Sequence, residues 1–144
     1  MAELLDPVGF SVKLLEGMIK FWKRFAPFIE SSGNFSDKEI PKLQEKLLRV
    51  EKYMDKLYAC EPKFGQDDHP LETEKQVFFL NLFNALVLYN LALQMVSNIE
   101  TVTKLNCFNM WQAFLTQCYV RISMHKINAF TILRGFLRNS LPVP

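Results

Sequence analysis

Apolar residues recur most regularly between residues 40 and 57. Alternating steps of three and four separate them, which places them along one narrow stripe of a helix, while charged residues occupy the other faces. Such a narrow seam predicts a partly exposed helix that packs along one line, either against its own domain or against a partner helix. The stripe consists of Ile40, Leu43, Leu47, Val50, Met54 and Leu57.

The start of this helix carries two competing signals. Ser36 followed by Glu39 fits a capping box, in which each side chain bonds the backbone amide of the other residue. Pro41 favours a start closer to itself, because proline is well suited to the first helical turn. The helix is therefore expected to begin between Ser36 and Pro41 and to end near residue 58.

A first amphipathic helix is predicted over residues 8–31. Its apolar residues again recur at three- and four-residue steps, with lysines on other faces. Pro27 should kink or shorten this helix, because a proline inside a helix removes a hydrogen bond. Residues 31–34, Ser-Ser-Gly-Asn, are typical of a helix stop and turn. The predicted apolar stripe comprises Val12, Leu15, Met18, Ile19, Trp22, Phe25 and Ile29.

The third predicted helix, residues 73–97, is apolar on most sides. Residues 76–99 carry no charge and are long enough to span a bilayer. The same stretch contains several carboxamides, each of which would need a hydrogen-bond partner inside a membrane. A buried core helix is therefore favoured over a membrane helix. Asn81 and Asn84 lie one turn apart on one face and are expected to be buried and bonded to neighbouring backbone.

Shorter segments complete the chain. Residues 60–70 are typical of a loop, and residues 102–115 predict a fourth helix. Residues 118–123 alternate and are β-branched, which predicts a short strand. Asn128 is suited to cap a final helix.

These elements predict a mostly α-helical single domain over residues 1–144. It would be a bundle of four to five helices, with one short strand or hairpin near 118–124. Two amphipathic helices within residues 8–60 would pack around the central buried helix and the C-terminal helices of residues 71–140.

Composition adds little chemistry to this picture. The chain has 144 residues, a formal net charge of +2, 13 phenylalanines and 5 glycines, which is typical of one folded domain with an aromatic core. Three cysteines without a CxxC pair predict neither a disulfide framework nor a zinc site. The N-terminal sequence has acidic residues where a secretory signal would have basic ones, so a cytoplasmic protein is expected.

Positive charge gathers after Glu100, beyond which no acidic residue follows. Basic residues interleaved with aromatic ones occur in proteins that bind single-stranded nucleic acid. Here their density is ordinary and the aromatic residues have core spacing, so a solvated basic face is favoured over a nucleic-acid site or an anionic membrane surface. The basic residues are Lys104, Arg121, Lys126, Arg134 and Arg138.

Few residues offer catalytic or metal chemistry. A thiol enzyme would need Cys107 or Cys118 with His125 as its base, but their spacing follows no catalytic rule, and buried cysteines are the simpler interpretation. Residues 67–69, Asp-Asp-His, are adjacent on a loop, where consecutive side chains do not readily converge on a metal. The scattered glycines form no phosphate-binding loop. No metal and no cofactor are predicted.

One stretch of the third helix resembles a known family. Residues 74–86, Glu-Lys-Gln-Val-Phe-Phe-Leu-Asn-Leu-Phe-Asn-Ala-Leu, are similar to the signature E-K-x-A-F-W-I-N-x-Y-N-A-L of the domain of unknown function 547 family. Residues 119–138 follow the outline of a second family segment, Y-x-I-x-G-H and then S-L-x-x-I-E-x-x-I-L-R, with His125 at the histidine position. Met124 stands where the family has a glycine, and Leu133 where it has an acid.

The resemblance covers about residues 53–142. It implies an alternative function, a thiol- or histidine-dependent enzyme with a site near Cys118 and His125. The loss of the family's acid at Leu133 makes this alternative the weaker of the two functions.

The favoured interpretation is a non-enzymatic protein–protein interaction module with an adaptor or regulatory role. It would act through a hydrophobic groove or helix face, on a helical protein partner or a second copy of the chain. Neither nucleic acid nor an integral membrane location is expected. The helix over residues 36–58 is the expected contact, through Leu43, Leu47, Val50 and Met54.

Overall fold

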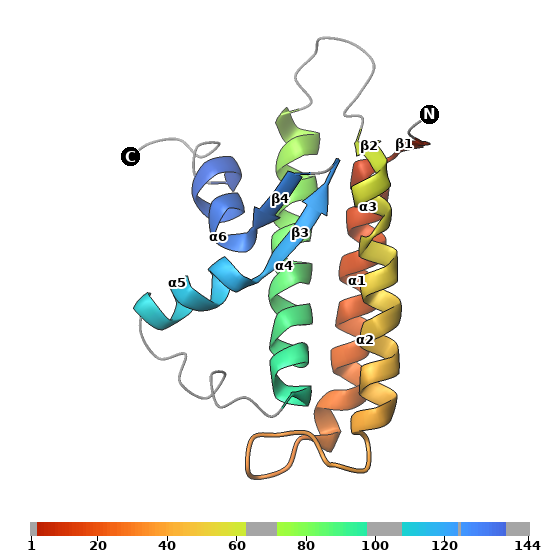
Figure 1. Ribbon diagram of the computed structural model, residues 1–144, viewed down its shortest axis with the longest axis vertical. Coiled ribbons are helices and arrows are strands. Elements are labelled where there is room, and N and C mark those ends of the chain that lie inside the picture. The colour runs from red at the N-terminus through yellow and green to blue at the C-terminus, as the bar shows by residue number, and fades with distance from the viewer. Residues whose placement is uncertain (1–2, 63–71, 98–107, 124, 138–144) are drawn as a thin grey trace.

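The chain is mostly helical with a short hairpin, as the sequence predicts. The computed structural model describes residues 3–62, 72–97, 108–123 and 125–137. Within these ranges three long helices run side by side, and the hairpin and shorter helical segments pack beside them (Figure 1). The Asp-Asp-His triplet and Cys107 lie outside the described residues.

Helix α1 spans Pro7–Phe25. Asp6 caps it, because a carboxylate oxygen of Asp6 accepts a hydrogen bond from the backbone amide of Gly9 at 3.2 Å. The helix ends at Phe25, before the predicted end at residue 31, and a 3₁₀ turn, η1 (Ala26–Phe28), follows it. The predicted shortening by Pro27 is thus confirmed, since a proline there has no amide proton to continue the helix.

The buried face of α1 differs from the predicted one. Val12 and Ile19 belong to the predicted stripe but are 38% and 40% exposed, whereas Phe10, Leu14 and Phe21 are buried. Helix α1 has two neighbouring apolar stripes, and the one with more phenylalanines removes more apolar surface from water when it turns inward.

Helix α2 spans Ile40–Met54, and the short helix α3 (Lys56–Ala59) follows it. The residue that caps α2 is Glu39, whose side chain makes no capping bond, so the predicted capping box at Ser36 is wrong. The alternative start near Pro41 is confirmed, because this proline lies in the first helical turn.

The connection between α1 and α2 is an ordered turn. Ile29 and Phe35 form an antiparallel bridge across it, and Phe35 is buried. Gly33 has a φ of 89°, which a residue with a side chain rarely adopts. The turn reverses the chain, so α2 runs antiparallel to α1 (Figure 1).

Helix α4 spans Glu72–Val96, close to the predicted 73–97. It runs parallel to α1, and it contacts both α1 and α2 (Figure 1). The central position predicted for this helix is confirmed, although one of its faces remains uncovered, as described below.

A β-hairpin follows α5 (Phe108–Gln117). Strand β3 (Tyr119–Ile122) pairs antiparallel with β4 (His125–Asn128). Ser123 begins the turn between them with a φ of 46°, and its backbone amide donates to the carbonyl of Leu57 at 3.0 Å. That bond attaches the hairpin turn to α3.

The final helix begins where the sequence predicts. Asn128 caps the short helix α6 (Ala129–Thr131), because its side-chain oxygen accepts from the amide of Thr131 at 2.8 Å. The helix continues with π-helical geometry as η3 (Ile132–Leu137).

A second strand pair was not predicted. Strand β1 (Glu3–Leu5) pairs in parallel with β2 (Cys60–Pro62), which begins the predicted loop. The pair joins the start of α1 to the end of α3.

One cluster of buried residues forms the core, and every long helix contributes to it. Residues from both halves of the chain therefore share the same interior. Its largest fully buried side chains are aromatic and include Phe25, Phe35, Phe78 and Phe114.

Candidate interaction surface

The predicted seam on α2 faces the protein's own core. Leu43, Leu47 and Met54 are buried there, and Val50 packs partly buried against the same cluster. The prediction that these four residues contact a partner is therefore wrong. A periodic apolar stripe shows that a helix face is covered, but it does not show which chain covers it.

The two asparagines of α4 have different environments. Asn81 is partly buried, and its side-chain amide donates to the hydroxyl of Ser11 at 3.2 Å. The predicted bond from Asn81 to neighbouring backbone is wrong, because its partner is the side chain of Ser11 on α1. Asn84 is exposed, so the prediction that it is buried is wrong.

The residues of the predicted thiol site lie apart. Cys118 is fully buried, and its thiol donates to the carbonyl of Phe114 at 3.2 Å. Burial raises the pKa of the Cys118 thiol to about 12, which disfavours the nucleophilic thiolate. His125 is exposed and pairs with Ile122, so it lies four residues along the hairpin from Cys118, or roughly 13 Å. The structure does not bring these two residues together.

Helix α4 leaves an apolar face uncovered. Leu80 is 48% exposed and Val77 is also exposed, while Leu91 is only partly buried. These residues and Asn84 are spaced so that they lie along one side of the helix. The predicted burial of α4 on most sides therefore fails on this side.

Helix α1 continues the uncovered face. Ser11 and Trp22 mark the side of α1 that adjoins α4, since Ser11 bonds Asn81 and the Trp22 indole bonds the Leu88 carbonyl. The apolar stripe of Val12, Leu15 and Ile19 follows directly around the helix from this side. Val12 and Ile19 are exposed, and Leu15 is partly buried.

The two exposed stripes lie on the same side of the molecule. Phe10 of α1 stacks on Tyr53 of α2 at 4.5 Å, which marks the opposite side of α1. In Figure 1, α2 and the hairpin are in front of α1 and α4, so both stripes face away from the viewer. We call this surface the α1–α4 face; it consists of Val12, Leu15, Ile19, Val77, Leu80, Asn84 and Leu91.

Charged side chains border the α1–α4 face along α1 but not along the uncharged part of α4. On the outer edge of α1 the exposed residues are Glu16, Lys20 and Lys23, which lie next to the stripe around the helix. The edge formed by α4 has no charge from residue 76 onward. The α1–α4 face is therefore apolar with one net basic border.

The α1–α4 face was missed by sequence reasoning. Val12 and Ile19 belong to the predicted apolar stripe of the first helix, and exposed and buried stripes look alike in one sequence. One sequence feature does indicate such a face. Helix α4 has no distinct polar face, so part of its apolar surface stays exposed unless other elements surround the helix.

By length and composition, residues 73–96 could cross a membrane, with a mean hydropathy of 1.5. A core helix of a soluble protein meets the same criterion, so this property assigns no location. The cytoplasmic location stays a prediction.

In the ranges that the structure describes, no group of three histidine, cysteine, aspartate or glutamate side chains could hold a metal ion. The predicted triplet at residues 67–69 is outside those ranges.

Comparison with known proteins yields no relative. No family model, curated protein or solved structure matches the chain. The resemblance to the domain of unknown function 547 family therefore stays a hypothesis that rests on the motif residues alone.

Proposed function

We propose that this protein is a non-enzymatic helical interaction module whose α1–α4 face binds an amphipathic helix of a partner protein. The observation that carries the proposal is the alignment of exposed apolar residues on two parallel helices. Exposed apolar residues that are grouped on one side of a protein mark interaction sites more often than isolated ones do.

A helix is the partner that suits this surface. Two helices packed side by side leave a groove between them, and the ridges of a third helix fit such a groove. Helix α2 already packs on the opposite side of the α1–α4 pair. A partner helix would pack on the free side in the same manner, with apolar residues spaced three and four apart.

Charge favours another protein over a second copy. Lys20 and Lys23 border the face on α1, so a partner helix with acidic residues beside its apolar stripe would complement them. A second copy offers little of this complement, because among the described residues of α1 Glu16 is the one acidic residue beside the α1–α4 face.

Site-specific photocrosslinking in cells tests this proposal. The photoreactive residue p-benzoylphenylalanine replaces Leu80 in one variant and Leu48 in a second. Leu48 is also exposed but lies on α2, away from the face. We expect crosslinks from position 80 to one partner protein, at a peptide that is amphipathic and acidic, and no such crosslink from position 48.

Charge reversal supplies the specificity control. Lys20→Glu with Lys23→Glu should weaken the crosslink from position 80 at least about fivefold, whereas Lys42→Glu with Lys46→Glu on α2 should leave it unchanged. The proposal is overturned if position 80 crosslinks mainly to lipid or to a second copy of this chain. It is also overturned if the two charge-reversed variants behave alike.

A further inference from the structure

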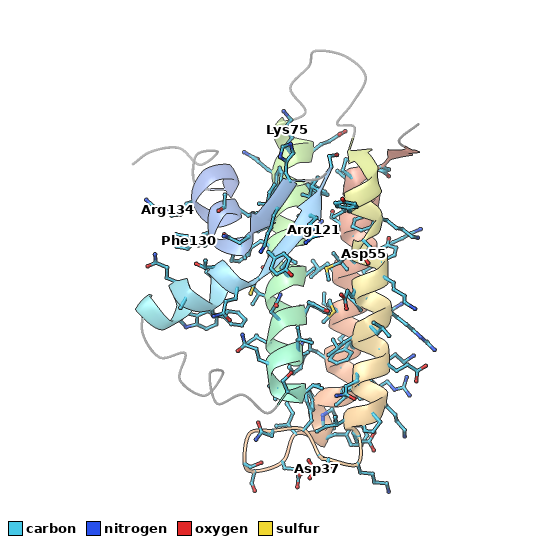
Figure 2. All side chains as sticks on the ribbon, in the orientation of Figure 1. Asp37, Asp55, Lys75, Arg121, Phe130 and Arg134 are labelled. Carbon is cyan, nitrogen blue, oxygen red and sulfur yellow. The ribbon has the colours of Figure 1, made fainter. Side chains whose placement is uncertain are left out.

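A cavity of about 370 Å³ lies between α2, α4 and β3. It is on the side of α4 that faces the hairpin, away from the α1–α4 face. Figure 2 labels two of its lining residues, Asp55, which directly follows α2, and Arg121 of β3. The volume suits a small molecule.

Acceptor groups are concentrated on the α2 wall. Glu51 and Asp55 lie one helical turn apart and both line the cavity. No ion pair involves either carboxylate in the part of the chain that the structure describes. The two carboxylates are therefore present without an ion pair, and Arg121 lines the opposite wall of the same cavity.

Tyr89 presents a hydroxyl group to the cavity. The residue is only 8% exposed, it lines the cavity, and its hydroxyl has no hydrogen-bond partner among the described residues. Burial first, and then the charges of Glu51 and Asp55, raise the pKa of Tyr89 to about 12. The hydroxyl therefore stays protonated and lies close enough to both carboxylates to sense them. The Tyr89 oxygen is not among the described buried atoms that lack a partner, so it is open to the cavity, where a ligand can bond it.

Asn90 adds one more acceptor beside Tyr89. Its side-chain amide donates to the carbonyl of Leu86 at 2.8 Å, which leaves the side-chain oxygen available to a ligand. Met54 and Leu93 supply apolar lining.

The rim of the cavity already accommodates cations on aromatic rings. The Arg121 guanidinium lies over the ring of Tyr58 at 5.8 Å, and the Lys126 ammonium lies over the ring of Tyr119 at 4.1 Å. Such contacts stabilise a positive charge through the face of the ring. These two charges occupy aromatic faces on the β3 side of the cavity, so a cationic ligand is expected on the opposite side, beside Glu51 and Asp55.

We infer that this cavity binds a small primary alkylammonium ion. The ammonium group would donate hydrogen bonds to Glu51, Asp55 and the Tyr89 hydroxyl oxygen, and its short alkyl chain would lie against Met54 and Leu93. This inference does not depend on the proposed partner helix, because the two sites share no residue.

A titration followed by NMR, with n-butylammonium chloride as the probe and sodium chloride at equal ionic strength as the reference, tests the inference. We expect saturable shifts of the backbone amides of Asn90, Tyr119 and Arg121. Tetramethylammonium has no N–H donor, so it should bind at least about fivefold more weakly. Butyrate should cause no saturable shift.

Matched variants identify the groups responsible. Tyr89→Phe removes only the hydroxyl and should weaken butylammonium binding about fivefold to tenfold. Tyr53→Phe, a tyrosine of α2 outside the cavity, should have no effect. Glu51→Gln with Asp55→Asn should abolish saturable binding, whereas Glu45→Gln should not change it. Arg121→Gln should strengthen binding about twofold or more, because it removes a like charge.

Three results would overturn the inference. One is a butylammonium response no larger than that to sodium chloride. Another is equal binding of tetramethylammonium, which would remove the role of the hydrogen bonds. The third is unchanged binding in the Glu51→Gln, Asp55→Asn variant while its spectrum shows that it is folded.

Discussion

The indole nitrogen of Trp22 donates a hydrogen bond to the backbone carbonyl of Leu88 at 3.0 Å. This bond joins α1 to α4, and the bond from Asn81 to Ser11 joins them a few turns earlier. Together the two bonds fix the parallel register of the helices. They lie along the inner margin of the α1–α4 face and so determine how its two apolar stripes are placed.

Trp22→Phe should lower the free energy of unfolding by about 1–3 kcal/mol, because it removes the bond to Leu88 and part of the packed indole. Urea unfolding followed by circular dichroism measures the change. Trp111→Phe is the control, since Trp111 is exposed; its effect should stay within about 0.5 kcal/mol. An equal decrease in the free energy of unfolding in the two variants would show that the Trp22 bond does not stabilise the α1–α4 pair.

Asn81→Ala should destabilise the protein by about 1 kcal/mol, while Asn84→Ala should change its stability by less than about 0.5 kcal/mol. The reason is that Asn81 bonds Ser11 and Asn84 is exposed. A double-mutant cycle with Ser11→Ala isolates the pair, and we expect a coupling of about 0.5–1 kcal/mol. A coupling of zero contradicts a stabilising bond between them.

Truncation of two neighbouring leucines of α2 should lower the free energy of unfolding to very different extents. Leu47 is 2% exposed and Leu48 is 50% exposed. Leu47→Ala should therefore cost about 2–5 kcal/mol of stability through the cavity it leaves, and Leu48→Ala less than about 0.5 kcal/mol. Chemical denaturation of both variants provides the test. If Leu47→Ala left stability unchanged, the seam would not be part of the core.

Cys118 should resist alkylation in the folded protein. Its thiol is buried, and burial raises its pKa to about 12, so both access and thiolate formation are suppressed. In a variant with Cys60→Ser and Cys107→Ser, iodoacetamide should modify Cys118 at least about a hundredfold faster in 8 M urea than in buffer. Mass spectrometry follows the modification, and similar rates in the two conditions would place the thiol at the surface.

Stability should fall as the pH rises above 9. The pKa of Cys118 is raised from 9.0 to about 12 and that of Tyr89 from 10.0 to about 12. Between the ordinary pKa of each group and its raised pKa, the unfolded chain has released a proton that the folded chain retains. The free energy of unfolding therefore decreases as the pH rises. For each such group the decrease approaches about 1.4 kcal/mol per pH unit.

Urea unfolding at half-unit steps from pH 8 to 11 measures this dependence. Cys118→Ala should flatten the slope between pH 9 and 10, where the thiol titrates before Tyr89 contributes. An identical slope in the variant would mean that another group causes the loss.

Local patterns predicted the elements whose determinants lie close in sequence. The spacing around Leu43 and Leu47 predicts α2, the carboxamide of Asn128 predicts the start of the last helix, and Pro27 predicts where α1 gives way. Each of these rests on an interaction within one or two turns of chain.

The candidate site depends on interactions that the sequence does not display. Val12 and Phe10 are equally acceptable as core residues by periodicity, and only the position of α4 decides which one is covered. The cavity likewise brings Tyr89 to Glu51 and Tyr119, residues far apart in the chain. Neither feature has a local signature, because each depends on tertiary packing.

The parallel pairing of β1 with β2 constrains how the protein can open. Residues 3–5 are held beside residues 60–62, while the Ile29–Phe35 bridge closes the other end of the same helical pair. Helices α1 and α2 are thus tied at both ends and should exchange their amide protons as one cooperative unit. A partner helix that inserted between α1 and α4 would therefore separate α4 from the α1–α2 pair, rather than separate α1 from α2.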